Sequence, residues 1–222
     1  DEYNVSITDD EKAAITAAAA QFMEDNSKDA INALGATQEI VEEYLTLETI
    51  QSKMKAAIVA GADTNVTDEE AKTGAYSYVG ISKTTHQDES GNTVDYTDEE
   101  KEELAAKVAD FAKAAKEDGL DAAAEDAGYT VSTGTFTQED DSVDDNLLAA
   151  LKNLKEGEVT DLIDGDSSYF VARLDKEVDE DATEETRQSI IEQRKDDLYD
   201  ETLDGWKEGI EWAVKEKVLS LI

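Results

Sequence analysis

Apolar residues recur at helical spacing along the first 61 residues of the chain. Thr8 and Glu11 have the spacing of a capping box, in which the threonine hydroxyl and the glutamate carboxylate satisfy free backbone donors. The apolar positions that follow, Ile15, Ala18, Ala19, Phe22 and Met23, predict a first helix. A short second helix is predicted to end near Gly35.

The longest predicted helix of this half begins after Thr37, a residue type that favours the N-cap, and runs toward Gly61. Its apolar stripe consists of Ile40, Val41, Tyr44, Leu47, Met54 and Ile58. We interpret this stripe as core, with a binding surface as the alternative reading.

The pattern changes after Thr67, whose spacing to Glu70 predicts another capping box. Residues 75–82 are rich in aromatic and β-branched side chains, which predicts a strand. Residues 84–96 are polar, contain the turn dipeptide Gly91-Asn92, and predict an exposed loop. The remaining predicted elements are a helix from Thr97 to Gly119, a brief helix over 120–127, a strand over 129–136, a helix over 142–154, and strands over 159–163 and 168–178 joined by an Asp-Gly turn at 164–167.

A long final helix is predicted after Thr183, which can cap it, with Glu184 and Glu185 placed favourably in its first turn. Its expected buried side comprises Ile191, Leu198, Trp206, Ile210, Val214 and Val218. Because about forty residues is long for one helix of a small domain, we expect it to break near Gly205 or to return and cover the first helices.

This order of elements predicts an α+β protein with one small antiparallel sheet domain inserted into a helical one. We place an N-terminal helical region at residues 1–73, the sheet domain at 74–181, and a C-terminal helix completing the helical domain at 182–222.

Charge narrows the possible partners. The chain carries 56 acidic against 20 basic residues, a formal charge of −36, which disfavours nucleic acids and anionic membrane surfaces as partners. The same charge fits either a solvated surface that resists aggregation or attraction to cationic unfolded chains. No apolar run approaches the ~20 residues of a membrane span, so we expect a soluble chain, in which an export signal that had been removed would leave no trace.

Missing residue types exclude several chemistries. Cysteine is absent, so no disulfide or thiolate site can form. The single histidine, His86, supports neither a catalytic triad nor a metal cluster, and we interpret it as an ordinary loop residue. Proline is absent too, so prolyl bonds of this chain cannot limit its own folding. A calcium site at Asp161, Asp164 and Asp166 lacks EF-hand spacing, and no cofactor is expected.

One segment resembles the parvulin family of peptidyl-prolyl isomerases. Residues 151–160 read Leu-Lys-Asn-Leu-Lys-Glu-Gly-Glu-Val-Thr and are followed by Ser168-Tyr169-Phe170, similar to the Gly-Glu-Val-Ser and Gly-Tyr-His segments of that family. Thr133-Gly134-Thr135-Phe136 is faintly similar to its Gly-Asp-Leu-Gly-x-Phe segment. The resemblance covers about residues 75–178 and implies a parvulin-like fold there.

The flanking segments resemble secreted foldases of the bacterial PrsA and SurA type. Asn65-Val66-Thr67-Asp68-Glu69-Glu70-Ala71 is similar to the segment that precedes their parvulin domain. Their helical region is likewise completed by a helix after that domain. The resemblance implies a location outside the cytoplasm, at the cell surface or on a lipid anchor, and newly exported or unfolded polypeptides as partners.

The resemblance also locates a proline-binding slot and shows where its chemistry has changed. Tyr78 and Phe170 occupy the positions of the two family histidines, whereas Val143 and Leu147 match the apolar residues that cradle proline. The Tyr78 hydroxyl is the remaining catalytic candidate, and an acidic member of the site corresponds to either Glu125 or Asp126. The alternative is that these apolar side chains only fill the core.

Loss of polar groups affects turnover more than binding, because such groups act on the transition state. We therefore expect a chaperone or foldase with weak or no isomerase activity. Two alternatives stay open: an active isomerase that uses Tyr78, and a secreted acidic binding or scaffold protein that shares only the fold.

Overall fold

A computed structural model describes residues 3–88 and 90–208. The chain divides into two compact units, one formed by Asp1–Asn65 with Ile191–Ile222 and the other by Val66–Ile190. Each is described by itself. Within the described ranges, no helix combines the length and apolar character that crossing a membrane requires.

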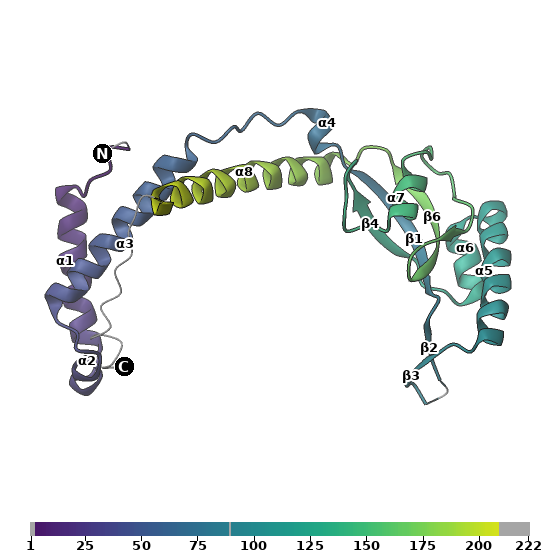
Figure 1. The fold of residues 1–222 in the computed structure, drawn as a ribbon, viewed down its shortest axis with the longest axis horizontal. Helices are drawn as coiled ribbons and strands as arrows, with labels where there is room; N and C mark the ends of the chain where they lie inside the picture. The colour runs from purple at the N-terminus through teal and green to yellow at the C-terminus, as the bar shows by residue number, and fades with distance from the viewer. Residues whose placement is uncertain (1–2, 89, 209–222) are drawn as a thin grey trace. The chain divides into compact units, whose positions relative to one another are not determined.

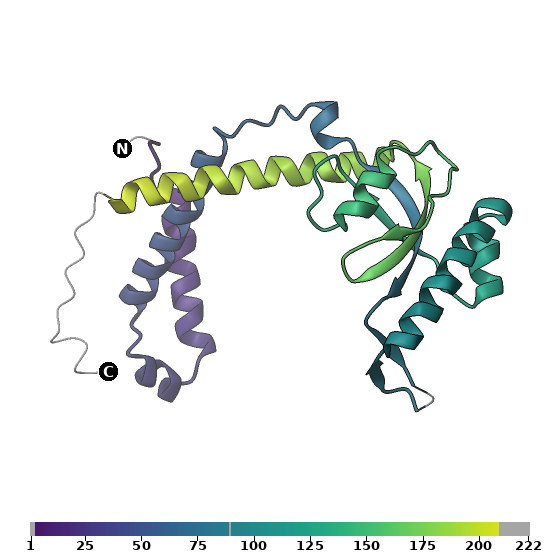
Figure 2. The same cartoon turned by 45° about the vertical axis from the view of Figure 1, so that its right-hand side comes forward.

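The helical unit contains α1 (Asp9–Asp25), α2 (Lys28–Leu34), α3 (Gln38–Val59) and the later part of α8 (Glu180–Glu208). The capping box of α1 forms as predicted, because Thr8 N–H donates to a Glu11 carboxylate oxygen and Glu11 N–H donates to the Thr8 hydroxyl. Helices α1 and α3 lie side by side in both views (Figures 1 and 2). Lys53 joins them through a 2.7 Å ion pair with Glu11.

The prediction that the apolar stripe of α3 forms core is wrong for its first half. Ile58 is buried, but Ile40, Tyr44 and Leu47 are 53%, 59% and 60% exposed. The physical reason is that α1 packs on a neighbouring face of α3, the face on which Lys53 lies. Periodicity indicated which residues share a face but not which face has a neighbour.

Helix α8 differs from its prediction in its first residue, in its cap and in the exposure of Trp206. It begins at Glu180, and Asp179 caps it by accepting a hydrogen bond from Ala182 N–H at 3.1 Å, so Thr183 is not the cap. Of the two alternatives predicted for its length, the break near Gly205 does not occur, because α8 continues through this residue. Trp206 is 39% exposed instead of buried. The predicted buried positions Ile210, Val214 and Val218 lie outside the described residues. The later part of α8 contacts the end of α3, where Lys55 pairs with Asp196 at 3.2 Å.

The second unit confirms the α+β class through an antiparallel four-stranded sheet in the order β4-β1-β6-β5. Its strands are β1 (Gly74–Ser82), β4 (Ser132–Phe136), β5 (Ile163–Asp164) and β6 (Ser168–Lys176). Helix α7 (Asp145–Leu151) covers one face, and α5 (Asp98–Asp118) and α6 (Leu120–Ala127) cover the other (Figure 1). Alternate residues of β1 and β6 therefore enter two different cores.

Two predictions about local structure in this unit are wrong. The predicted loop over 84–96 contains a hairpin of β2 (Thr85–Gln87) and β3 (Thr93–Asp95). The Asp88 carboxylate stabilises its turn by accepting hydrogen bonds from the N–H groups of Ser90 and Asn92. The predicted strand over 159–163 shrinks to β5 and an isolated bridge between Val159 and Arg173, because other residues of the segment bond to β6 irregularly.

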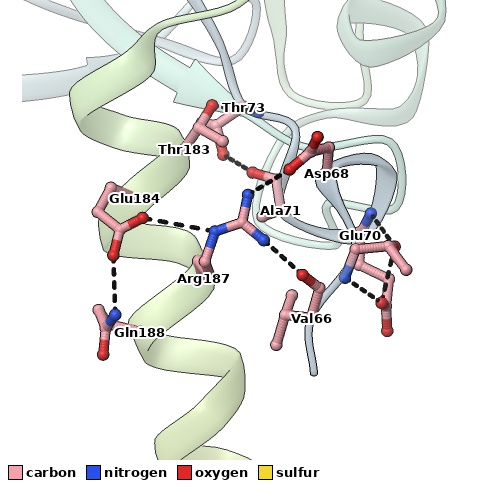
Figure 3. Close-up of polar contacts among 10 residues, drawn as sticks. Val66, Asp68, Glu70, Ala71, Thr73, Thr183, Glu184, Arg187 and Gln188 are labelled. Atoms are coloured by element: carbon pink, nitrogen blue, oxygen red, sulfur yellow. Dashed lines mark hydrogen bonds and ion pairs between the residues drawn. The ribbon is translucent and has the colours of Figure 1, made fainter. Parts of the chain in front are cut away.

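An arginine holds the beginning and the end of this unit together, as Figure 3 shows. The Arg187 guanidinium on α8 donates to the carbonyl of Val66 and to the carboxylate of Asp68, at the start of α4 (Asp68–Ala71). Close by, Thr73 N–H donates to the Thr183 hydroxyl. These bonds fix α4 and the first turns of α8 beside the start of β1.

Candidate functional site

The Gly-Glu-Val-Thr motif runs beside β6 and is joined to it by hydrogen bonds. Gly157 has a φ of 83°, a left-handed value that glycine adopts without steric cost. Its N–H donates to the carbonyl of Leu174 at 2.7 Å, and Thr160 N–H donates to the carbonyl of Ala172 at 2.8 Å. The buried Thr160 hydroxyl accepts from Ala172 N–H at 3.0 Å. The motif thus fixes the strand that carries Phe170.

The four side chains expected at the proline slot lie together on the α7 face of the sheet. Tyr78 on β1 and Phe170 on β6 have ring centroids 6.2 Å apart. Val143, just before α7, and Leu147, within it, are buried in the same apolar cluster. The structure therefore brings Tyr78, Val143, Leu147 and Phe170 into one environment.

Two further aromatic residues, which the sequence analysis did not assign to the site, belong to this cluster. Tyr76 lies beside Tyr78, with ring centroids 5.4 Å apart, and contacts Phe136 edge-on at 5.9 Å. A Cβ atom on Gly134 would come within 2.8 Å of the Tyr76 ring, so the glycine allows that ring to lie against the backbone of β4. Strand alternation was the available signal for Tyr76, because it shares a strand face with Tyr78.

Asp144, whose carboxylate lies close to Phe170, has a structural role. A Cβ on Gly165 would meet both the Phe170 ring at 2.6 Å and an Asp144 oxygen at 2.5 Å. Asp144 caps α7 by accepting from Asn146 N–H, and its other oxygen accepts from Asp166 N–H at 2.8 Å. Burial raises the pKa of Asp144, but the hydrogen bonds from these backbone N–H groups lower it by more. The pKa of Asp144 is therefore below its usual value.

The surroundings of the cluster shift the pKa of one of its hydroxyl groups. Burial raises the pKa of the Tyr76 hydroxyl, and the neighbouring Tyr78 and Asp140 raise it further. Such a cluster can hold an apolar ring by contact and stacking. Of the two aromatic residues Tyr78 and Phe170, only Tyr78 carries a hydroxyl group.

The other candidate residues lie elsewhere. Glu125 and Asp126 are on α6, which packs against the opposite face of the sheet, so neither joins the slot. His86 lies in the β2–β3 hairpin, where it stacks on Tyr96 at 4.5 Å and approaches Glu100 at 3.8 Å.

The aspartates considered for calcium are engaged in ion pairs. Asp161 pairs with Lys116 and Asp164 pairs with Lys83, each at 2.6 Å. Over residues 3–88 and 90–208, no group of three or more acidic, histidine or cysteine side chains is arranged to hold a metal ion.

Comparison with known proteins gives the class. A family model described as "PPIC-type PPIASE domain" matches residues 82–200, more than half of the 222-residue chain. The protein therefore belongs to the PPIC-type peptidyl-prolyl isomerase domain family. The matched range includes Val143, Leu147 and Phe170 and begins after Tyr78.

Solved structures similar to this chain include two isomerases called PrsA and a SurA-like chaperone. PrsA from Bacillus cereus is 20% identical, with 96% of this chain and 79% of that chain covered and a TM-score of 0.40. PrsA from Bacillus anthracis is 20% identical, with 96% and 94% covered and a TM-score of 0.36. A SurA-like chaperone of Campylobacter jejuni is 12% identical, with 95% and 79% covered and a TM-score of 0.33. A comparison with curated protein sequences finds no match.

Proposed function

We propose that this protein is an extracytoplasmic folding factor that binds unfolded or newly exported polypeptides through its helical unit and has weak or no prolyl isomerase activity. The observation that carries the proposal is the exposed apolar stripe of α3. Family membership supports a role in protein folding, and the resemblance of the flanking segments to exported foldases supports the location, at the cell surface or on a lipid anchor.

The stripe is formed by Ile40, Tyr44 and Leu47, which recur four and three residues apart and so share one face of α3. Each is more than half exposed. An exposed group of large apolar side chains on a helix is typical of a surface that binds apolar segments. Leu34, at the end of α2, adds a further exposed side chain at 72%.

Charge around the stripe favours cationic clients. Glu39, Glu43 and Glu48 are exposed on the same helix, and no lysine or arginine occurs in α3 before Lys53. Carboxylates at the rim of an apolar surface attract basic segments and repel acidic ones. We therefore propose that preferred clients combine apolar with basic residues.

Weak turnover is proposed from the slot. The barrier to prolyl rotation is about 18–20 kcal/mol, and lowering it requires polar groups aimed at the twisting amide. Tyr78 and Phe170 stand at the histidine positions and pack with Tyr76 in an aromatic cluster. This arrangement retains apolar contact for a proline ring and replaces the imidazoles.

A client-aggregation assay tests the binding part. Burying three half-exposed side chains contributes about 1 kcal/mol each, so their loss should weaken client binding roughly a hundredfold. We expect the triple variant Ile40→Ser, Tyr44→Ser, Leu47→Ser to lose protection against light scattering by an unfolded cationic client. The control Val178→Ser removes a 46% exposed apolar side chain from the other unit and should keep it. Equal protection by wild type and triple variant would refute the stripe as the binding surface.

A protease-coupled assay on proline peptides tests the catalytic part. We expect wild type to give rates near the uncatalysed background with several residues before proline. A clear acceleration that Tyr78→Phe abolishes would instead establish an active isomerase in which the Tyr78 hydroxyl takes the place of imidazole.

A further inference from the structure

A small cavity lies at one end of the sheet, apart from Tyr78 and Phe170. Its apolar floor includes Phe136, Leu151 and Leu174, contributed by β4, α7 and β6. Its volume is about 170 Å³, which exceeds the roughly 150 Å³ of an apolar cavity able to hold benzene. The cavity therefore has room for one apolar side chain but not for a long acyl chain.

Two lysines at the cavity have no carboxylate partner among the described residues. Lys72, which follows α4, and Lys152, which follows α7, both line it. Neither ammonium group forms a hydrogen bond or ion pair within residues 3–88 and 90–208, although Lys72 is half-buried. Most of the other lysines in the described ranges pair with carboxylates; Lys83, Lys116 and Lys176 are examples. Free ammonium groups beside an apolar floor point to a ligand with a carboxylate next to an apolar group.

Backbone geometry near the cavity favours a polypeptide as that ligand. Phe136 ends β4, and β4 is an edge strand of the four-stranded sheet, so its outer backbone groups can pair with an extended segment. Gln138, two residues further, also lines the cavity and carries an amide that can bond a peptide group. A peptide alongside β4 can thus reach the floor with its last side chain.

We propose that this cavity binds the C-terminal end of a polypeptide, with Lys72 and Lys152 holding the terminal carboxylate and the last apolar side chain on the floor. The proposal shares with the proposed function only the kind of ligand, a polypeptide. It assigns a site in the sheet unit that is separate from the α3 stripe. Glu177 also lines the cavity and opposes an anion, so its neutralisation should tighten binding.

Fluorescence anisotropy on the full chain tests this with an amino-terminally labelled peptide that ends in leucine. We expect the free acid to bind about tenfold tighter than the same peptide as a C-terminal amide, since one charged contact of this kind is worth about a factor of ten. A peptide ending in serine should also bind more weakly, because the floor is apolar. Equal affinity of acid and amide, or no saturation by the acid up to about 1 mM, would overturn the proposal.

Lysine variants test whether the peptide binds at this cavity. Lys72→Gln and Lys152→Gln should each weaken binding of the free-acid peptide severalfold. Lys72→Arg keeps the positive charge and should bind like wild type, which distinguishes loss of charge from a folding defect. Lys155→Gln is the matched control, because Lys155 is an exposed neighbouring lysine that does not line the cavity. Unchanged binding in both glutamine variants would place the peptide elsewhere. The α3 triple variant should bind the peptide normally, so failure of either proposal can be told from failure of the other.

Discussion

Replacing Thr160 by valine removes one hydroxyl from a buried place and changes little else. Thr160 is 4% exposed, and its hydroxyl accepts the N–H of Ala172 at 3.0 Å. Valine keeps the branched shape but offers a methyl group to that donor. The bond from Thr160 N–H to the Ala172 carbonyl at 2.8 Å involves only backbone and can remain.

The expected cost follows from the donor that is left without a partner. A buried N–H with no acceptor costs about 1–3 kcal/mol. The matched variant Thr160→Ser keeps the oxygen and loses one methyl group, at about 0.8 kcal/mol. Valine should therefore be the more destabilising substitution although it is the more apolar one.

The assay must report on the sheet unit. Residues 66–190, which form the sheet unit, contain no tryptophan, so tryptophan fluorescence does not follow this unit. Hydrogen exchange at the Ala172 amide follows the sheet unit directly, and urea unfolding gives the stability of each variant. We expect Ala172 to exchange faster in Thr160→Val than in Thr160→Ser. A valine variant as stable as the serine variant would refute the role given to the hydroxyl.

Two further predictions concern other parts of the chain. Gly134→Ala places a Cβ 2.8 Å from the Tyr76 ring and should cost about 1–3 kcal/mol by overpacking, measured by urea unfolding; no change would mean that the ring moves freely. Hydrogen bonds from Lys53 and then Thr8 lower the pKa of Glu11 from 4.5 to about 2. A lowered carboxylate pKa stabilises the fold above about pH 4.5 and loses this effect as pH falls toward 2, so the difference in melting temperature between wild type and Glu11→Gln should shrink over that range; a constant difference would contradict it.

Elements with local signals were predictable from the sequence. The boxes that begin at Thr8, Thr67 and Thr97 all form, because each depends on residues within one helical turn. The hairpin over 85–95 was missed because its strands are three residues long and carry no buried alternating face. Its turn depends on the side chain of Asp88, which hydrophobic patterning does not register.

Contacts between distant segments were harder to foresee. Motif spacing led to Tyr78 and Phe170, and the structure places them in neighbouring strands. Tyr76 fills the space beside them because Gly134 has no side chain. The spacing of motifs in the sequence does not reveal how closely a side chain packs against a neighbouring strand. The exposure of Tyr44 was missed because it also depends on a contact between distant segments, namely the position of α1 on α3.

If Tyr78 and Phe170 stand at the family's two histidine positions, as we propose, these replacements affect stability and catalysis in opposite directions. Imidazoles facing a slot must keep polar partners or water, whereas Tyr78 and Phe170 gain free energy by burying ring surface. A site filled in this way contributes to the core and gives up groups that act on a transition state. The exposed stripe of α3 is the opposite case, because Tyr44 and Leu47 are 59% and 60% exposed and leave most of their apolar surface unburied in the fold. Under the proposed function, this apolar surface is buried only when a polypeptide client binds to it.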